Sequence, residues 1–322
     1  MHKQLPTWQL IHNSLQNSIA VMLLYVLESK GSSPGRQGFM MAVNANGEIN
    51  GSLGGGIMEH KFVEMAKAKL QQQAEEISVH HQIHDKSVAK NQSGMICSGE
   101  QTIFLYTVKK EEATAIEKII AALQQNKNAS LHLSPNGIGF AEEIPNKNYE
   151  LQIKDDSNFS FTEKLGYKNA LYIIGGGHCS LALSQLMSNM DFYIHLFDHR
   201  EELNTMEQNN FVHEKKVLND FAELSSLIQS SQNSFVVIMT VGYRTDAIAV
   251  KALQGKEFAY LGILGSQNKM KKMFEQLEEE GADKLWLDKI HSPIGLPIKS
   301  QTTEEIAISI AAEIIKVKNK DL

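Results

Sequence analysis

The fold is decided by one stretch of sequence, residues 170–180, which reads ALYIIGGGHCS. The apolar run 170–174 predicts a buried strand, and the glycine triplet 175–177 predicts a tight turn that opens a helix over about 178–190. The pattern matches G-x-G-x-x-[G/A], with Ser180 as the small third residue that lets helix and strand pack closely. It indicates a Rossmann-type domain.

The residues around this turn suggest a ligand. Gly175 allows the tight turn, and Gly177 lets the backbone approach the pyrophosphate of a dinucleotide. The next predicted strand, 193–197, leads to Asp198, 23 positions after Gly175, where such domains carry the acid that binds a ribose. Arg200 could instead pair with a 2′-phosphate. The alternative is a Rossmann-type scaffold without a nucleotide, in which the glycines serve packing only.

The rest of the second half alternates strands with helices. Strands are predicted over 234–239 and 259–264, and helices over 246–253, 267–280 and 303–315. This alternation predicts a doubly wound α/β domain, a parallel sheet covered on both faces. Ligands of such sheets bind at the carboxyl ends of the strands, where the sequence also places Arg244, Gly265, Ser266 and the segment 291–296.

The first half predicts a smaller α/β domain. It reads as strands over 19–27, 39–43 and 101–108 and helices over 57–73 and 114–123. A polar stretch, 126–167, follows without a predicted element, and we place the domain boundary near its end. The expected domains are residues 1–155 and 156–322.

Composition excludes several classes of protein. The 322 residues are 42% hydrophobic and 21% charged, an ordinary globular balance. A net charge of −6 argues against nucleic-acid binding. No apolar run approaches the roughly 20 residues of a membrane span, and no secretory signal is visible. Because two cysteines do not suggest a disulfide framework, we expect a cytoplasmic protein.

Two loops of the first half carry residues suited to anion binding. Gly54, Gly55 and Gly56 lead into a helix, so their N–H groups can form an anion nest at its positive end. Ser32 and Arg36, in an upstream glycine-rich loop, could bind the same anion. Composition favours equally the alternative of two tight turns that need glycine only for conformation.

The two cysteines differ in their surroundings. Cys97 lies between glycines, in a loop before a predicted strand, which suits contact with a soft metal or sulfur. The alternative is a small buried hydrophobe, the more frequent fate of a free cysteine. Cys179 lies in the first turn of the Rossmann helix, where packing is favoured. Next to it, His178 is a candidate for proton transfer.

Three histidines of the first half, His80, His81 and His84, look like a metal cluster. His80 and His84 are four residues apart and would share one face of a helix. Apart from Asp85, no nearby acid or cysteine completes a ligand set, so the sequence favours a solvated polar stretch.

These segments together resemble the xanthine dehydrogenase accessory factor family, also called XdhC/CoxI-like, over nearly the whole chain. In the first half the resemblance rests on Gly31-Ser32-Ser33-Pro34-x-Arg36-x-Gly38, Gly51-Ser52-Leu53-Gly54-Gly55-Gly56-x-x-Glu59 and Met95-x-Cys97-x-Gly99-Glu100. In the second half it rests on Gly175-x-Gly177-His178, Asp198-x-Arg200, Gly262-Ile263-Leu264-Gly265-Ser266 with Lys269, Pro293-Ile294-Gly295-Leu296 and the helical stretch 304–313.

The resemblance implies a dimeric protein that matures molybdenum hydroxylases such as xanthine dehydrogenase. It implies binding of the molybdenum cofactor (molybdopterin), cooperation with a cysteine desulfurase that supplies the sulfido ligand, and delivery of the cofactor to the apoenzyme. Cys97 would then contact the cofactor or its sulfur. The glycine loops would hold the pterin phosphate, and Glu59 would be a further residue of the cofactor site.

Two other functions stay open at this point. One is an NAD(P)-dependent oxidoreductase, with Gly175, Gly177, Asp198 and Arg200 on the dinucleotide and His178 as acid or base. The other is a nucleotide-sensing regulator without chemistry. The first-half glycine loops and the cysteine between glycines favour the cofactor-binding protein, which need not be an enzyme, because a simple dehydrogenase does not require them.

Overall fold

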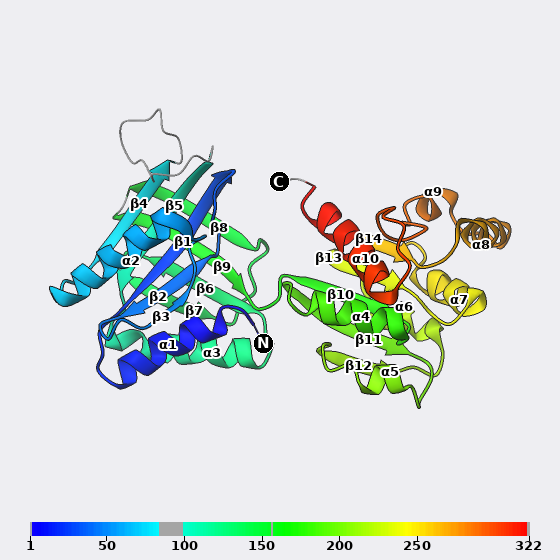
Figure 1. Ribbon diagram of the computed structural model, residues 1–322, viewed down its shortest axis with the longest axis horizontal. Helices are drawn as coiled ribbons and strands as arrows, with labels where there is room; N and C mark the ends of the chain where they lie inside the picture. The colour runs from blue at the N-terminus through cyan, green and yellow to red at the C-terminus, as the bar shows by residue number, and fades with distance from the viewer. Residues whose placement is uncertain (1, 84–98, 156, 321–322) are drawn as a thin grey trace. The chain divides into compact units, whose positions relative to one another are not determined.

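The computed structural model describes residues 2–83, 99–155 and 157–320, and the chain divides into two compact units, residues 1–166 and 167–322 (Figure 1). We expected the division after residue 155. It falls later because β9 (Asn158–Leu165) pairs with β6 (Ala129–Ser134) and β8 (Tyr149–Asp155), and therefore belongs to the first unit.

The first unit is built on a five-stranded antiparallel sheet. The order is β3 (Ile49–Gly51), β2 (Met40–Asn44), β1 (Val21–Gly31), β5 (Gly99–Thr107) and β4 (Ile77–Ile83). The central strand β1 is apolar without alternation because both of its faces are covered. Met22 and Leu24 pack against α2 (Gly56–Gln71), whereas Leu23 and Tyr25 face the second sheet.

The stretch that we expected to lack regular structure forms that second sheet. Its antiparallel order is β7 (Gly137–Ala141), β6, β9 and β8. It packs on the first sheet through aromatic contacts such as Phe104 with Phe159, whose ring centroids lie 5.2 Å apart. The same core receives α1 (Leu5–Gln16), which we did not predict, and α3 (Ala113–Gln124), which follows the short helix η1 (Lys110–Glu112).

The second unit confirms the predicted Rossmann-like domain. Five parallel strands lie in the order β12 (Glu214–Val217), β11 (Phe192–Asp198), β10 (Asn169–Ile174), β13 (Ser231–Ile238) and β14 (Phe258–Ile263). The chain therefore runs outward from β10 in one direction and then restarts at β13 in the other. Between β10 and β13 lies the topological switch point, where ligands of open α/β sheets bind.

Helices cover both faces of this sheet, so it is doubly wound (Figure 1). One face carries α4 (His178–Met187), α5 (Asn204–Glu207) and α10 (Thr303–Lys318). The other carries η2 (Phe221–Glu223), α6 (Leu224–Leu227), α7 (Tyr243–Leu253), α8 (Gln267–Glu279) and α9 (Lys284–Leu287). Strand residues alternate between the two cores: Val237 packs on the first face, and Val236 and Ile238 on the second.

The expectation that His80 and His84 share a helix face is wrong. His80 lies in the strand β4, with its ring centroid 5.5 Å from that of Phe62 on α2, and His84 lies outside the described residues. No cluster of His, Cys, Asp and Glu suited to a metal ion occurs in the part of the chain that the structure describes. None of its helices there has the length and apolar character of a membrane span.

Candidate functional site

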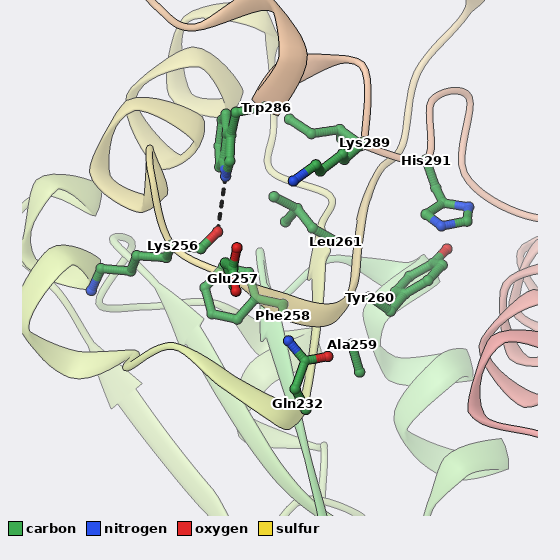
Figure 2. Close-up of a pocket in the computed structure, with 11 residues that line it drawn as sticks. Gln232, Lys256, Glu257, Phe258, Ala259, Tyr260, Leu261, Trp286, Lys289 and His291 are labelled. Atoms are coloured by element: carbon green, nitrogen blue, oxygen red, sulfur yellow. Dashed lines mark hydrogen bonds between the residues drawn. The ribbon is translucent and has the colours of Figure 1, made fainter. Parts of the chain in front are cut away.

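A cavity of about 210 Å³ lies at the amino ends of β13 and β14 (Figure 2). Gln232, Phe258 and Trp286 are among its lining residues, and the indole Nε1 of Trp286 donates to the carbonyl of Lys256 at 2.8 Å. His291 lines the same cavity. Since parallel sheets bind ligands at the other end of their strands, this cavity is not the site that the glycine turn predicts.

The segment 291–296, which we expected near the ligand, packs against α10 instead. His291 pairs with Gly262 of β14 and places Nδ1 3.3 Å from Oε1 of Glu313. The backbone N–H of Gly295 donates to Oε2 of Glu313 at 2.8 Å, and Ser309 Oγ donates to the Leu296 carbonyl at 2.6 Å. These motif residues therefore build the fold around α10.

We call the ends of β10, β11, β13 and β14, with the loops that follow them, the carboxyl edge (residues 175–178, 198–200, 240–246 and 264–266). At this edge Gly175 is required by packing. Its φ is +108°, and a Cβ there would lie 2.3 Å from the carbonyl oxygen of Met239. The turn therefore fixes the end of β10 against the end of β13, directly at the switch point.

Gly177 and Gly242 have a different environment. Their φ angles are −74° and −175°, which other residues adopt readily. Chain neighbours aside, no described atom lies within 4 Å of the position that a Cβ would take at either glycine. Each is the N-cap of a helix, α4 or α7, without a side-chain cap. The two glycines thus leave the backbone accessible at the starts of two helices, one on each side of the switch point. Since the first N–H groups of a helix have no intrahelical partner, this arrangement suits an anionic ligand.

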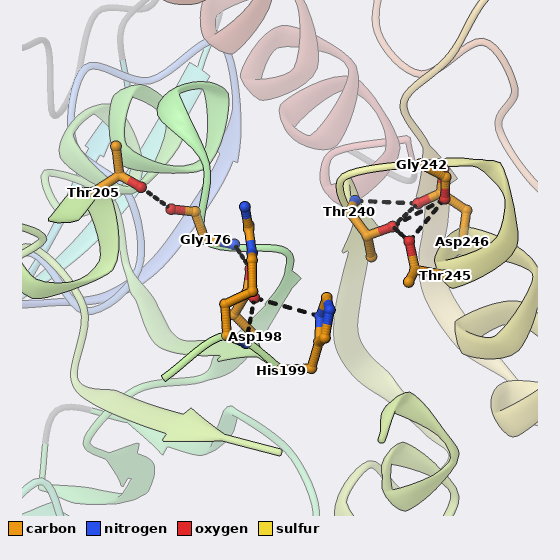
Figure 3. A network of polar contacts seen from close by, with 9 residues as sticks. Gly176, Asp198, His199, Thr205, Thr240, Gly242, Thr245 and Asp246 are labelled. Atoms are coloured by element: carbon orange, nitrogen blue, oxygen red, sulfur yellow. Dashed lines mark hydrogen bonds and ion pairs between the residues drawn. The ribbon is translucent and has the colours of Figure 1, made fainter. Parts of the chain in front are cut away.

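Asp198 is fully engaged within the protein (Figure 3). Its Oδ2 accepts hydrogen bonds from the Gly176 N–H at 2.6 Å and from Nη2 of Arg200 at 2.7 Å. Its Oδ1 accepts from the Arg200 backbone N–H and Nε, both at 2.9 Å. Burial alone would raise the pKa of Asp198, but the hydrogen bonds from Arg200 and Gly176 lower this pKa to about 2. Asp198 therefore holds the glycine turn as a carboxylate.

A second network lies at the end of β13 (Figure 3). Asp246, in the first turn of α7, accepts from the N–H and the hydroxyl of Thr240 at 3.1 and 2.6 Å. Burial raises the pKa of Asp246. Beside this network Arg244 is exposed, and the Val241 side chain is 70% exposed. The end of β13 thus offers both a cation and an apolar surface.

The remaining predicted residues of this edge are less distinctive. Ser266 is an exposed N-cap of α8, and Gly265 packs under Met270, whose Cε would lie 2.5 Å from a Cβ. His178 is exposed at the start of α4. Cys179 is partly buried and packs against the core, as the packing interpretation predicts, and burial raises the pKa of its thiol. A thiol with a raised pKa is a poor nucleophile at neutral pH.

In the first unit the expected anion nest already contains a carboxylate. Oε2 of Glu59 accepts from the backbone N–H groups of Leu53 at 2.8 Å and Gly55 at 2.9 Å, and from the Ser52 hydroxyl at 2.7 Å. Although burial acts to raise it, these hydrogen bonds lower the pKa of Glu59. Of the three N–H groups that we expected to bind a phosphate, that of Gly55 therefore binds Glu59, and that of Gly54 donates to the Ser52 hydroxyl at 3.0 Å.

The two loops of the first unit are packed against each other. A Cβ at Gly54, where φ is +118°, would lie 2.3 Å from the backbone nitrogen of Gly35. The buried amide of Gln101 donates to the carbonyls of Gly35 at 2.9 Å and Leu53 at 3.3 Å. We did not predict this role of Gln101; its one signal is a polar residue in a strand that is otherwise buried.

The other candidates of these loops lie at the surface or outside the described residues. Arg36 is exposed and donates through Nη1 to the Gly31 carbonyl at 3.0 Å, and Ser32 is also exposed. Gly56 is the first residue of α2, and its φ is +72°. Cys97 lies outside the described residues, which resume at Gly99.

Comparisons with known proteins agree with this architecture. A model of the XdhC Rossmann domain matches residues 171–314, and a model of the XdhC and CoxI family matches residues 14–81. A Bacillus subtilis protein described as a probable subunit of xanthine dehydrogenase is 22% identical over 95% of this chain and 96% of its own length. The crystal structure of a Bacillus halodurans protein described as a xanthine dehydrogenase has a TM-score of 0.69, at 23% identity, over 98% of this chain and 96% of that one.

A longer relative is the Escherichia coli K12 protein YqeB, described as uncharacterised. It is 26% identical over 91% of this chain, but this chain spans only 43% of its length. The structural similarity to the Bacillus halodurans protein shows that the two chains share a fold over nearly their whole length.

Proposed function

The chain belongs to the XdhC and CoxI family, and on that premise we propose that it is an accessory factor of a xanthine dehydrogenase-type molybdenum hydroxylase. In this role it binds the molybdenum cofactor, supports its sulfuration together with a cysteine desulfurase, and delivers it to the apoenzyme, as a cytoplasmic homodimer. The description of the Bacillus subtilis relative as a probable subunit of xanthine dehydrogenase supports the choice of partner.

The observation that carries this proposal is the open backbone at Gly177 and Gly242. Molybdopterin has a phosphate and a flat heterocycle. The uncapped N-termini of α4 and α7 provide N–H groups suited to the phosphate. Neither glycine has a side chain to block close approach, and the exposed Val241, next to Gly242 in the chain, offers an apolar surface for a ring. The residues of the carboxyl edge therefore fit such a ligand.

The first unit fits the phosphate less well. Its nest is filled by Glu59, and a second anion there would face the negative carboxylate. We therefore assign the phosphate to the carboxyl edge of the second unit. The resemblance names Cys97 as the soft contact for the metal or its sulfido ligand, and we propose that role separately from the phosphate site; Cys179 is partly buried and packs against the core. The bound cofactor supplies the molybdenum and its sulfur ligands, while this chain binds and orients it.

The alternative, an NAD(P)-dependent oxidoreductase, receives less support from the geometry. Such enzymes hold a ribose diol with the acid at the end of the second strand. Here that acid is Asp198, and four donors already occupy its oxygens. His178 is exposed at the start of α4, where water competes for its ring nitrogens.

The test is anaerobic binding of molybdenum cofactor to the full-length chain. We expect near-stoichiometric binding, at least tenfold weaker in the double variant Gly177→Ala/Gly242→Ala and weaker in Cys97→Ala. Ser188→Ala, at the opposite end of α4, is the matched control and should bind normally. Absence of cofactor binding, together with NADPH-dependent turnover, would contradict the proposal and favour the oxidoreductase.

A further inference from the structure

We propose that Arg200 builds a phosphate-monoester subsite at the end of β11, with Asp198 as the residue that positions it, and that this corner rejects a ribose diol. The inference rests on the proposed ligand site at the carboxyl edge, and it specifies which chemical group that site recognises. It differs from the usual role of an acid at this position, which is to accept hydrogen bonds from a ribose.

Asp198 is already saturated with donors. A carboxylate offers about four lone-pair positions, two on each oxygen. The protein fills two on Oδ1 and two on Oδ2, from Gly176 and Arg200. His199 adds a contact of 3.5 Å between Nδ1 and Oδ1. The Asp198 side chain is 1% exposed, so a ribose hydroxyl finds neither a free lone pair nor open access.

Arg200, in contrast, has an unused side. A guanidinium carries five N–H donors in a fixed fork. Two of them, one on Nε and one on Nη2, are directed at Asp198. The other three have no partner among the residues that the structure describes. Because the Arg200 side chain is 32% exposed, this outer side of the fork is accessible to a ligand.

The fork of Arg200 is also held in place beside the glycine turn. Asp198 holds both Arg200 and the N–H of Gly176, so the guanidinium lies next to the turn that opens α4. Its side-chain rotamer is already fixed by two charge-assisted hydrogen bonds, which reduces the entropy lost on binding. The outer guanidinium N–H groups and the uncapped N–H groups at the start of α4 can then share the oxygens of one phosphate.

The outer N–H groups of Arg200 and the start of α4 therefore favour a phosphate monoester as the ligand at the end of β11. Molybdopterin carries such a group, and so does the 2′-phosphate of NADPH. NADPH and NADH therefore form a matched pair of probes, since they differ only in that phosphate. For the wild-type chain we expect NADPH to bind at least tenfold more tightly than NADH, as measured by isothermal titration calorimetry.

The deciding variant is Arg200→Ala, in which NADPH should lose at least tenfold in affinity and its preference over NADH should vanish. Since that change leaves Asp198 buried without its partner, Arg200→Gln, which keeps one amide donor for the carboxylate, serves as a second variant with the same expected direction. Circular dichroism confirms that each variant is folded. Lys216→Ala removes an exposed cation from β12 without touching Asp198 and should retain the preference.

Three results would overturn the subsite. They are equal binding of the two nucleotides to the wild type, an unchanged preference in both folded Arg200 variants, and failure of the wild type to bind either NADPH or inorganic pyrophosphate. Competition separates the inference from the proposed function. Displacement of NADPH by molybdopterin supports both, whereas Arg200-dependent NADPH binding that molybdopterin does not displace supports the subsite and contradicts the cofactor role.

Discussion

The two glycine-rich turns of this chain look alike in sequence and differ in what occupies them. Residues 51–56 precede α2 and residues 175–177 precede α4. In the first turn Glu59 accepts the N–H groups of Leu53 and Gly55, so the nest is closed from within. In the second turn a carboxylate also intervenes, but Asp198 takes only the N–H of Gly176 and leaves the start of α4 open.

The difference teaches that a glycine pattern does not by itself indicate a ligand. Gly54 and Gly175 have positive φ angles and would clash with backbone, so the fold alone explains them. Gly177 and Gly242 have neither constraint, so the fold alone does not explain them. Glycines of this second kind are the better evidence for a binding site.

The largest expected effect is that of Gly54→Ala. The new Cβ would lie 2.3 Å from the nitrogen of Gly35 in a backbone region that L-residues avoid. We expect the free energy of unfolding to fall by about 3 kcal/mol or more, as measured by urea denaturation. Gly175→Ala should match it in the second unit. A loss below about 1 kcal/mol for Gly54→Ala would show that the loop can relax. It would contradict the claim that packing requires glycine at this position.

Asp198→Asn comes next, because it replaces a carboxylate that four donors surround. We expect a loss of about 2–3 kcal/mol at pH 7. The pKa of Asp198 is about 2 when folded, against an ordinary value of 3.8, so between these values the unfolded chain binds more protons. Its contribution is therefore complete above about pH 4 and disappears as pH falls toward 2.

The measurement is the unfolding free energy of the wild type and of Asp198→Asn between pH 6 and pH 2. The difference between the two proteins should shrink toward low pH. A difference that stays constant with pH would mean that the carboxylate charge does not hold the glycine turn.

How far the sequence predicts the fold depends on how local the signal is. The β10–α4–β11 unit is readable because the strand, the turn and the helix adjoin in the chain. The strand β9 is not, although Phe159, Phe161 and Leu165 alternate toward the core. The fourth inward-facing residue of β9 is Glu163, a fully buried acid whose Oε1 accepts a hydrogen bond from Nε2 of Gln4 at 3.1 Å. Gln4 and Glu163 are too far apart in the chain for a sequence pattern to reveal this pair.

The candidate site shows the same limit. The need for Gly175 arises from Met239, which directly follows β13 and is distant in sequence, and the role of Gln101 arises from two loops upstream. Glu59 is different, since it is only four residues after Gly55 and could have been anticipated as the acceptor in the nest. The sequence could therefore have predicted that Glu59 binds the first glycine turn, whereas it could not predict the open space at Gly177.

Glu59→Ala should have a smaller effect, because Glu59 is only partly buried and water can replace part of its role. We expect the free energy of unfolding to fall by about 1–2 kcal/mol. The vacated nest should then accept an external anion, so added phosphate should raise the melting temperature of this variant more than that of the wild type. Equal effects of phosphate on the two proteins would show that the loop collapses without its carboxylate.

The smallest change in stability is expected for Gly177→Ala, and this variant tests the comparison most directly. A methyl group at residue 177 meets no described atom within 4 Å, and φ at this position suits alanine. The free energy of unfolding should change by no more than about 0.5 kcal/mol. Affinity for the molybdenum cofactor should nevertheless fall at least tenfold, because the methyl group occupies the approach to the N–H groups of α4. Stability measured by urea denaturation and affinity measured by anaerobic titration would therefore separate in this variant, whereas in Gly54→Ala stability alone is lost. A normal affinity in a stable Gly177→Ala protein would mean that the open turn is not the contact surface, and the distinction between the two loops would then lose its functional meaning.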